Sequence, residues 1–169
     1  MFKDAIGRQW QLATIQCDFN LPERFDLSFI NEKNEKERPV VIHRAIAGSL
    51  ERFMGIMIEH FAGTFPLWIA PVQTVVVPVS ENFIDYAREV QATLKKSGIR
   101  SEFDDSSDGL NKKVRNAETA HTNYILVIGE KEMNEKSVAV RNYKTKEQTE
   151  VKLTTFIENI RTEIENKAL

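Results

Sequence analysis

The hydrophobic pattern of the chain changes at Pro71, and this change constrains the fold more than any other feature. A continuous apolar run at 72–79 is followed by apolar residues at helical spacing over 80–97. Gly98 then supplies a stop for the helix. Strands that alternate with helices imply a parallel or mixed sheet, so we expect an α/β unit in this half of the chain.

The alternation continues to the carboxyl end of the chain. Thr155 and Glu158 have the spacing of a capping box, which predicts the start of the last helix. The other expected elements are strands at 99–103, 124–128, 137–141 and 149–152, and a helix at 110–120.

Before Pro71 the pattern is that of an antiparallel β region with one helix. Apolar residues spaced by three and four follow Ser49, which predicts a helix with Ser49 as its N-cap and Gly63 at its end. Imperfect alternation predicts strands with one buried face. These strands are expected at 8–19, 25–30 and 39–46, with an exposed hairpin loop at 31–38.

Composition excludes several classes of protein. The chain has 169 residues, 41% of them hydrophobic and 28% charged, which fits one globular domain or two small ones and not a disordered chain or a coiled coil. No apolar run is long enough to span a membrane, and the start lacks a signal core, so we expect a cytoplasmic protein. Cys17 is the single cysteine, which excludes an internal disulfide.

Arg52 is the first candidate for a functional residue. It falls in the first turn of the predicted helix, where backbone N–H groups already favour an anion. A guanidinium there adds a planar fork that fits phosphate oxygens, although cations are usually disfavoured at this end. The alternative is an ordinary surface ion pair of Arg52 with Glu51 or Glu59.

Polar side chains among apolar neighbours are the second group of candidates. Gln9, Gln11 and Thr14 either line a polar pocket or face water. His43 lies on an apolar strand, where a lone histidine is more often a core residue than a metal ligand. A zinc site needs further ligands, and no convincing set lies near His43 in the sequence.

A basic stretch in the second half is the third candidate. The net charge is only −2, from 23 basic and 25 acidic residues, so a uniformly basic nucleic-acid binder is excluded. Two interpretations remain: a local patch that binds phosphates, or a solvated face with no partner. The eight basic residues between 110 and 146 are Lys112, Lys113, Arg115, Lys131, Lys136, Arg141, Lys144 and Lys146, against four acidic ones.

Taken together, six motifs along the chain closely resemble the carboxyl-terminal part of the threonyl-tRNA synthetase family. The resemblance is most specific in the first half and weaker but collinear in the second. The motifs are RQWQ at 8–11, TIQCDFNLPERF at 14–25, RPVVIHRAI at 38–46, GSLERF at 48–53, FPLWIAPVQ at 65–73 and VAVR at 138–141.

The resemblance implies an α+β end of a class II catalytic domain at 1–66, with an antiparallel sheet. It implies a three-layer α/β anticodon-binding domain with a mixed sheet at 67–169. The function implied is that of a threonine–tRNA ligase, which uses ATP with magnesium to activate threonine and transfers it to threonine tRNA. The family works as a homodimer.

The resemblance also assigns roles to single residues. Arg52, in the third class II signature, matches the arginine on the ATP phosphate tail, and Gln16 matches a position on the threonine side. His43 resembles one of three protein ligands of a zinc that binds threonine. Gln11, Thr14 and Ser49 match ATP-contacting positions, and Arg115, Lys131, Glu132 and Arg141 match positions that contact the anticodon.

Several family features are missing from this sequence. The other two zinc ligands and the first two class II signatures belong upstream of residue 1, and the stretch at 106–111 departs from the family's more basic pattern. We therefore expect a fragment that is inactive alone and that self-associates through an exposed apolar surface in residues 1–64. The alternative is a non-catalytic tRNA-binding module, a free-standing anticodon-binding domain.

Overall fold

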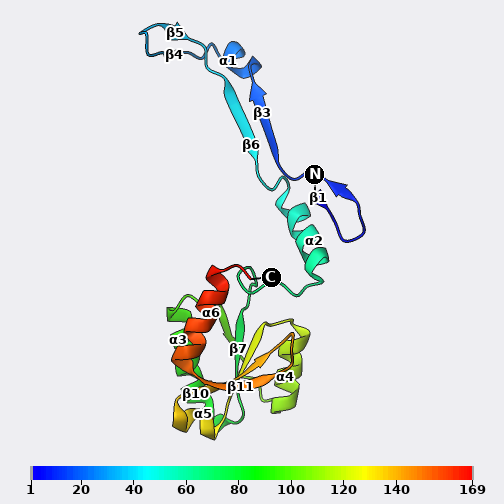
Figure 1. Cartoon of the computed structure of the whole chain (residues 1–169), viewed down its shortest axis with the longest axis vertical. Coiled ribbons are helices and arrows are strands. Elements are labelled where there is room, and N and C mark those ends of the chain that lie inside the picture. The colour runs from blue at the N-terminus through cyan, green and yellow to red at the C-terminus, as the bar shows by residue number, and fades with distance from the viewer. Residues whose placement is uncertain (1, 169) are drawn as a thin grey trace. The chain divides into compact units, whose positions relative to one another are not determined.

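The computed structural model describes residues 2–168, which divide into two compact units (Figure 1). Unit 1 is Met1–Ala62 and unit 2 is Gly63–Leu169. Among the described residues, no helix is both long and apolar enough to cross a membrane.

Unit 2 is built on a five-stranded sheet with the strand order β11-β10-β9-β7-β8. β7 pairs in parallel with β8 and β9, whereas β10 pairs antiparallel with β9 and β11. The mixed sheet predicted from the sequence is therefore confirmed. The strands are β7 Thr74–Pro78, β8 Ser101–Phe103, β9 Tyr124–Ile128, β10 Ser137–Asn142 and β11 Gln148–Lys152.

Helices cover both faces of this sheet, which makes unit 2 a three-layer α/β structure (Figure 1). Because side chains alternate along a strand, Val76 and Leu126 face α3 and α6, whereas Val75 and Ile125 face α4. The helices are α3 Ile84–Lys96, preceded by a 3-10 turn at Glu81–Phe83, α4 Leu110–Thr119, α5 Glu130–Glu135 and α6 Leu153–Glu165.

Two local features of unit 2 differ from the sequence expectation. The capping box at Thr155 is wrong, because α6 begins at Leu153, directly after β11, and its N-cap residue Lys152 makes no side-chain cap bond. The Glu132 carboxylate instead closes a capping contact at α5, where it accepts the Gly129 N–H at 2.9 Å. α5 has only six residues, too few to show a helical period in the sequence.

Unit 1 consists of short antiparallel strand pairs and two helices. In its longest pair, β3 with β6, Thr14 lies opposite Ala45 and Gln16 opposite His43. β1 pairs with β2, and β4 pairs with β5. The elements are β1 Phe2–Lys3, β2 Gln9–Trp10, β3 Thr14–Asp18, α1 Asn20–Arg24, β4 Phe29–Ile30, β5 Lys36–Glu37, β6 Val41–Ala45 and α2 Leu50–Phe61.

The strands of unit 1 are shorter than the sequence predicts. The single strand expected at 8–19 is two strands, because the chain leaves the ladder at Leu12, whose carbonyl oxygen lies close to Gly48. Pro22 does not simply end a strand: it lies near the start of α1, where its missing N–H costs no helical bond. The strand expected at 25–30 is reduced to Phe29–Ile30, which pairs with Lys36–Glu37 inside the predicted loop.

The apolar surface expected on unit 1 is confirmed. Among its described residues only Asp4, Pro22 and Ile56 are buried. Ile15 is 68% exposed and Ile42 is 65% exposed, and both project from the same face of the β3–β6 pair. Unit 1 therefore presents a sheet with one apolar face open.

Candidate functional site

The amino end of α2 holds Arg52 in a defined environment. Ser49 is the N-cap, as predicted: its hydroxyl oxygen accepts the Arg52 N–H at 3.4 Å, and its O–H donates to Glu51 at 2.7 Å. Among the described residues Arg52 makes no ion pair, so the proposed pairing with Glu51 or Glu59 is wrong. Its guanidinium lies instead 5.5 Å from the centre of the Trp10 ring, a cation–π contact.

Asp4 fixes the position of Trp10. The carboxylate is buried and accepts hydrogen bonds from the Trp10 indole N–H at 2.8 Å, the Arg8 Nε–H at 2.5 Å and the Arg8 backbone N–H at 2.8 Å. Burial raises the pKa of Asp4, but the hydrogen bonds from Trp10 and Arg8 outweigh it and lower the pKa to about 2. Asp4 is therefore an ionised acceptor that holds the ring beneath Arg52.

The other unit 1 candidates lie beside this helix end or along one face of the neighbouring strands. Gly48 has φ +64°, and a Cβ there would lie 3.0 Å from the Leu12 oxygen, so glycine lets residues 11–14 run close to the start of α2. Thr14 and Gln16 are two residues apart on β3 and share a face, and His43 lies opposite Gln16. The structure thus places Thr14, Gln16 and His43 on one face of the β3–β6 pair.

His43 is not a core residue. Its side chain is 46% exposed, and its Nε2 lies 2.9 Å from Asp18 Oδ2, at the edge of a depression of about 620 Å³. Backbone N–H donation from Leu21, followed by the bond with His43, lowers the pKa of Asp18. Across residues 2–168 no three histidine, cysteine or carboxylate side chains are grouped as a metal site, so these residues do not by themselves fit a zinc ion.

In unit 2 a single carboxylate holds Arg141. Glu118 on α4 accepts from Arg141 Nε at 3.0 Å and from Lys146 Nζ at 3.3 Å. Donation by Arg141, which outweighs the opposing effect of burial, lowers the pKa of Glu118. Within the described residues the terminal Nη groups of Arg141 make no hydrogen bond, so Glu118 orients the guanidinium and leaves its outer donors available.

Arg141 borders a cavity of about 240 Å³ between α4 and the outer strands. Leu110 and Val114 of α4 and Val127 of β9 supply its apolar wall, and Asn111 and Gln148 supply amide groups. An apolar slot with a few amides and a fixed guanidinium suits a flat ring with hydrogen-bonding edges.

The remaining basic residues of unit 2 do not form one free patch. Lys113 is buried, and its ammonium donates to the Asp104 carbonyl at 3.3 Å. Lys131 pairs with Glu150, which lowers the pKa of Glu150 and raises that of Lys131. Arg115 is exposed on α4. Ion pairs and burial therefore occupy part of the basic stretch at 110–146, and only its remaining side chains are open to a phosphate partner.

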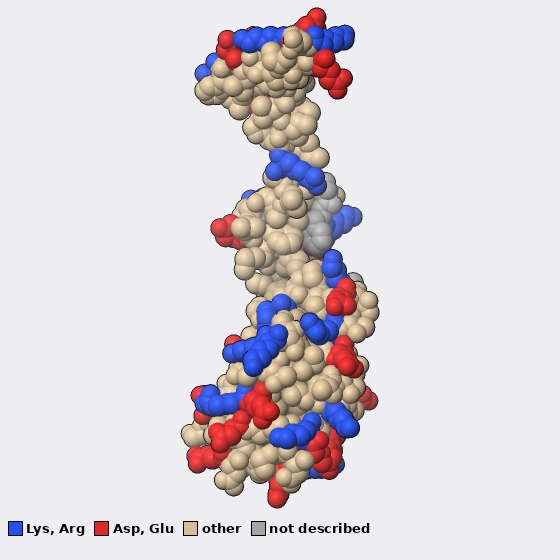
Figure 2. Space-filling model, turned by 90° about the vertical axis from the view of Figure 1, so that its left-hand side faces the viewer, with Lys and Arg blue, Asp and Glu red and all other residues tan. Residues whose placement is uncertain are grey.

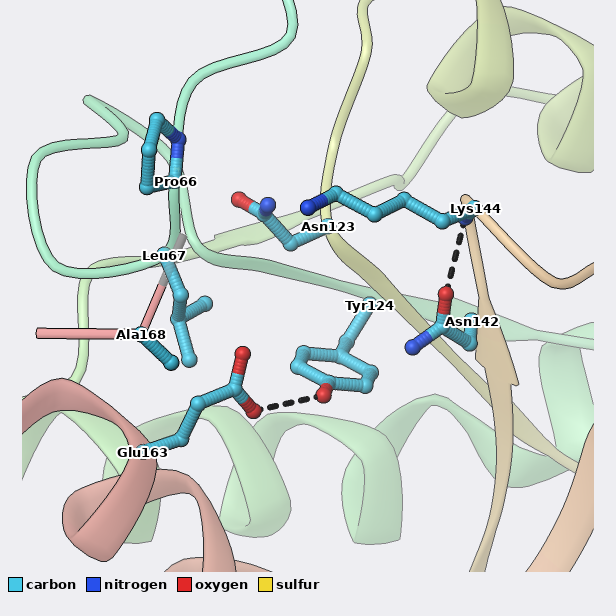
Figure 3. Close-up of a pocket in the computed structure, with 8 residues that line it drawn as sticks. All are labelled: Pro66, Leu67, Asn123, Tyr124, Asn142, Lys144, Glu163 and Ala168. Atoms are coloured by element: carbon cyan, nitrogen blue, oxygen red, sulfur yellow. Dashed lines mark hydrogen bonds between the residues drawn. The ribbon is translucent and has the colours of Figure 1, made fainter. Parts of the chain in front are cut away.

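A second cavity in unit 2 is too small for a ligand of nucleotide size (Figure 3). It measures about 40 Å³, and Tyr124 donates to Glu163 across its floor at 2.7 Å. Burial, reinforced by Glu163, raises the pKa of Tyr124. The Oδ1 atom of Asn123 on its wall is buried and has no hydrogen-bond partner among residues 2–168. Since a water needs roughly 10–15 Å³, this space suits ordered water.

Sequence reasoning missed the acidic residues that orient the basic candidates. Glu118 and Glu150 lie 23 and 19 residues from their partners Arg141 and Lys131, so no local spacing reveals the pairs. The only signal was the expected pairing of neighbouring strands and helices, which places these elements side by side without fixing which charges meet.

Comparison with protein families agrees with the division into two units. Residues 1–61 match the class II core domain of the tRNA synthetases for Gly, His, Pro, Ser and Thr. Residues 73–163 match the anticodon binding domain family.

Curated relatives cover nearly the whole chain. A threonine–tRNA ligase of Thermus thermophilus is 52% identical over 99% of this chain, and threonine–tRNA ligase 2 of Bacillus subtilis is 47% identical over 99%. The chain spans about a quarter of the length of these relatives, 25% and 26%.

Solved structures share the fold and point to the same family. The RNA-binding domain of threonyl-tRNA synthetase from Cryptosporidium parvum superposes with a TM-score of 0.82 at 39% identity, over 94% of this chain and 40% of that one. A prolyl-tRNA synthetase from the same organism has a TM-score of 0.66 over 93% of this chain and 36% of that one, at 24% identity, and shows the fold alone. The chain therefore belongs to the anticodon binding domain family, and the two curated relatives described above are threonine–tRNA ligases.

Proposed function

We propose that this chain works within a threonine–tRNA ligase, where unit 2 binds the anticodon of threonine tRNA and unit 1 contributes to the site that activates threonine. The observation that carries the proposal is the collinear 52% identity across both units, with the class II motif residues gathered in unit 1. The 169-residue chain alone would be inactive, since it spans only 25% of that relative.

Arg141 is the residue of unit 2 that we expect to read the anticodon. Its Nε is held by Glu118, and Arg141 is one of the residues that line the 240 Å³ cavity. Bidentate donation from arginine to a base edge is a common specific contact with nucleic acids. Arg115, Lys131 and Glu132 are proposed to act around it, with Glu132 already engaged by the Gly129 N–H and so less free to contact a base.

Arg52 is the residue of unit 1 that we expect to meet ATP. A cation–π contact with Trp10 holds its guanidinium in place, and the amino end of α2 adds backbone N–H donors. This combination is suited to phosphate oxygens. Thr14 and Gln11 are proposed to contact the nucleotide, and Gln16 the amino acid. Ser49 acts first as the helix cap, because its O–H already donates to Glu51 and its oxygen already accepts the Arg52 N–H.

In the proposed reaction the threonine carboxylate attacks the α-phosphate of ATP and pyrophosphate leaves. A ribose hydroxyl of the tRNA then attacks the adenylate and releases AMP. Magnesium would neutralise phosphate charge when bound. Arg52 would bind the phosphate tail and hold it in line, which requires no proton transfer from the arginine.

His43 is proposed as a single zinc ligand of the complete enzyme. Its exposed ring and its bond with Asp18 leave it accessible and oriented, but the described residues supply no second and third ligand around it. Removal of His43 should therefore leave the metal content of the 169-residue chain unchanged. A cytoplasmic location and a homodimeric complete enzyme belong to the same proposal.

Binding of threonine tRNA tests the role of unit 2. We expect the full chain to prefer the native transcript over one with a changed anticodon, and to keep that preference between about 50 and about 200 mM salt. Arg141→Ala should cost about 1–3 kcal/mol and erase the preference. Lys96→Ala, on α3 at the opposite face of the sheet, should leave the preference intact.

Equal, salt-sensitive binding of both transcripts would contradict anticodon reading by unit 2. It would favour nonspecific attraction between lysines and phosphates, whose affinity falls steeply with salt.

A non-catalytic tRNA-binding module is the second candidate function. It is favoured by the core of unit 2, which is formed from unit 2 residues alone. The two functions differ in their need for Arg52. In a protein that joins this chain to a complete class II core, Arg52→Ala should abolish threonine-dependent ATP–pyrophosphate exchange in a ligase and should leave a binding module unaffected.

Self-association of the 169-residue chain is proposed to occur through unit 1. Ile15 and Ile42 present apolar surface on one face of β3–β6, and both edges of this pair are open among the described strands. We expect the sedimentation coefficient to rise with concentration, and the double substitution Ile15→Glu with Ile42→Glu to abolish the rise. Glutamate at Val79, which is 44% exposed in unit 2, is the matched control.

A further inference from the structure

His121 joins three segments of unit 2 that are distant in sequence. It follows the carboxyl end of α4, and its Nδ1 lies 2.7 Å from the hydroxyl of Thr64 and 2.7 Å from that of Tyr143. Thr64 lies at the start of unit 2, and Tyr143 lies in the turn between β10 and β11. The imidazole therefore links the first residues of the unit to the turn that follows Arg141.

The backbone at His121 would favour a different residue. Its φ is +56°, in the left-handed region that commonly ends a helix and that glycine adopts without cost. Its N–H donates to the Glu118 carbonyl at 3.1 Å, and the next N–H, of Thr122, donates to the Ala117 carbonyl at 3.1 Å, as in a helix C-cap. Glycine would fit this cap better, so the backbone geometry does not explain a histidine here. The contacts of the imidazole with Thr64 and Tyr143 are what a histidine contributes.

A second contact holds the same segments together. Asn123 donates from its side-chain Nδ2 to the Phe65 carbonyl at 3.0 Å, and the backbone carbonyl of Asn123 accepts the Tyr143 N–H at 2.9 Å. The backbone of the turn is thus fixed independently of His121. What His121 adds is the position of the Tyr143 side chain.

The Tyr143 ring is connected to Arg141 by contacts with Lys146 and Glu118. Lys146 Nζ lies 4.2 Å from the centre of that ring and 3.3 Å from Glu118 Oε1. The same Oε1 atom accepts from Arg141 Nε. Lys146 and Arg141 therefore share one acceptor atom, so a change in the position of Lys146 changes how Glu118 can orient the guanidinium.

We propose that His121 is a positioning residue for Arg141, the residue of unit 2 proposed to read the anticodon. Through Tyr143 and Lys146 it sets the orientation of the Arg141 guanidinium toward the anticodon loop. The inference rests on the proposed role of Arg141. It adds a residue that touches no RNA, that lies outside the cavity, and whose effect on RNA binding passes through Glu118.

Two substitutions test the link without disturbing the backbone. His121→Asn keeps a residue that tolerates positive φ but removes the ring that reaches Tyr143. Tyr143→Phe keeps the ring beneath Lys146 and removes only the hydroxyl. In the full 169-residue chain each should weaken binding of an RNA hairpin with a threonine anticodon about three- to tenfold, while circular dichroism and the unfolding midpoint change little.

The Arg141 side chain supplies a direct readout. In ¹H–¹⁵N spectra the Arg141 Nε–H bonded to Glu118 should give a distinct cross-peak, assigned by its loss in Arg141→Lys. His121→Asn and Tyr143→Phe should each shift or broaden that cross-peak, a change that a general loss of stability does not produce. Ser97→Ala, at the C-cap of α3, is the control that should leave the cross-peak unmoved.

A double-substitution cycle separates this inference from the proposed function. In the Arg141→Ala background His121→Asn should cause no further loss of RNA binding. An equal further loss would overturn the inference, as would wild-type binding and an unmoved cross-peak in His121→Asn. If Arg141→Ala itself leaves anticodon preference intact, the proposed reading of the anticodon fails, and the cross-peak still decides whether His121 positions Arg141.

Discussion

The two units differ most in where their apolar side chains lie. In unit 2 every residue of β7 is buried, because α3 and α6 cover one face of the sheet and α4 the other. In unit 1 β3 and β6 form a two-stranded pair whose Ile15 and Ile42 are mostly exposed. Figure 2 shows broad areas of the first unit without charged side chains, whereas both signs of charge are interspersed over unit 2.

This difference indicates that similar local β patterns give a stable core only when other layers cover the strands. Unit 2 brings its own covering helices, so its strands are central. Unit 1 has one long helix, α2, of which only Ile56 is buried. Polar contacts around the buried Asp4 tie β1 to β2, and the described residues of unit 1 supply no layer that covers the apolar face of the β3–β6 pair.

The largest effect is expected in the core of unit 2. Leu126→Ala removes a fully buried side chain from β9 and should lower the free energy of unfolding of unit 2 by about 2–5 kcal/mol. Ile42→Ala, at a mostly exposed position in unit 1, should change unfolding by less than about 0.5 kcal/mol. Trp10 and Trp68 are the two tryptophans, one in each unit, so fluorescence of Trp10→Phe and Trp68→Phe variants in urea reports each unit separately.

An equal loss of unfolding free energy from both substitutions would contradict the difference between the two units. It would mean that Ile42 is covered in solution, and sedimentation of the same sample would show whether a second copy covers it.

Acid should disorder unit 1 through Asp4. The folded-state pKa of about 2 lies below the ordinary value of 3.8, so the stability from ionised Asp4 is complete above pH 3.8 and is lost as pH falls through about 2. Trp10 fluorescence of the Trp68→Phe chain should stay constant from pH 7 to about 4 and change below it. Asp4→Asn should show the altered emission already at pH 7, since an amide cannot replace an ionised acceptor for Trp10 and Arg8. A midpoint above pH 4 would contradict the assigned role of Asp4.

The sequence predicts unit 2 better than unit 1 for a physical reason. The strand at 72–79 and the helix at 80–97 are long and strongly patterned, and the expected mixed sheet is present. In unit 1 the expected strand at 8–19 breaks at Leu12, because the close approach of Gly48 is a tertiary contact that no period reveals. Ser49 is an N-cap as predicted, since a cap depends on a few neighbouring residues.

In the candidate site, too, local features could be predicted from the sequence and tertiary contacts could not. Arg52 could be placed at a helix start from local spacing alone. Its contact with Trp10 could not be predicted, nor could that of Arg141 with Glu118, because each pair joins elements that the sequence does not show to be adjacent. The resemblance of motifs supplied candidate roles, and the structure supplies the neighbours that orient the side chains.

Gly48 offers a smaller test within unit 1. Gly48→Ala should destabilise unit 1 by more than Gly7→Ala, because both have positive φ but only a Cβ at Gly48 meets a backbone oxygen, at 3.0 Å. Positive φ alone costs an alanine about 1–2 kcal/mol, so the difference between the two variants isolates the close approach. Trp10 fluorescence in urea measures both. Equal losses would show that the segment at Leu12 moves aside to accommodate the added methyl group.

The smallest effect is expected for the ion pair of Lys131 and Glu150. The Lys131 side chain is 62% exposed, so solvent and salt screen the attraction, and Lys131→Met should change the free energy of unfolding of unit 2 only slightly. Any loss should vanish in about 1 M salt, where charges are screened within a few ångströms. Glu150→Gln should cost somewhat more, because that carboxylate also accepts the Ser137 hydroxyl at 3.0 Å. A loss from Lys131→Met comparable with that of Leu126→Ala would mean that surface charges, and not covering layers, stabilise unit 2, and the contrast between the two units would then need another cause.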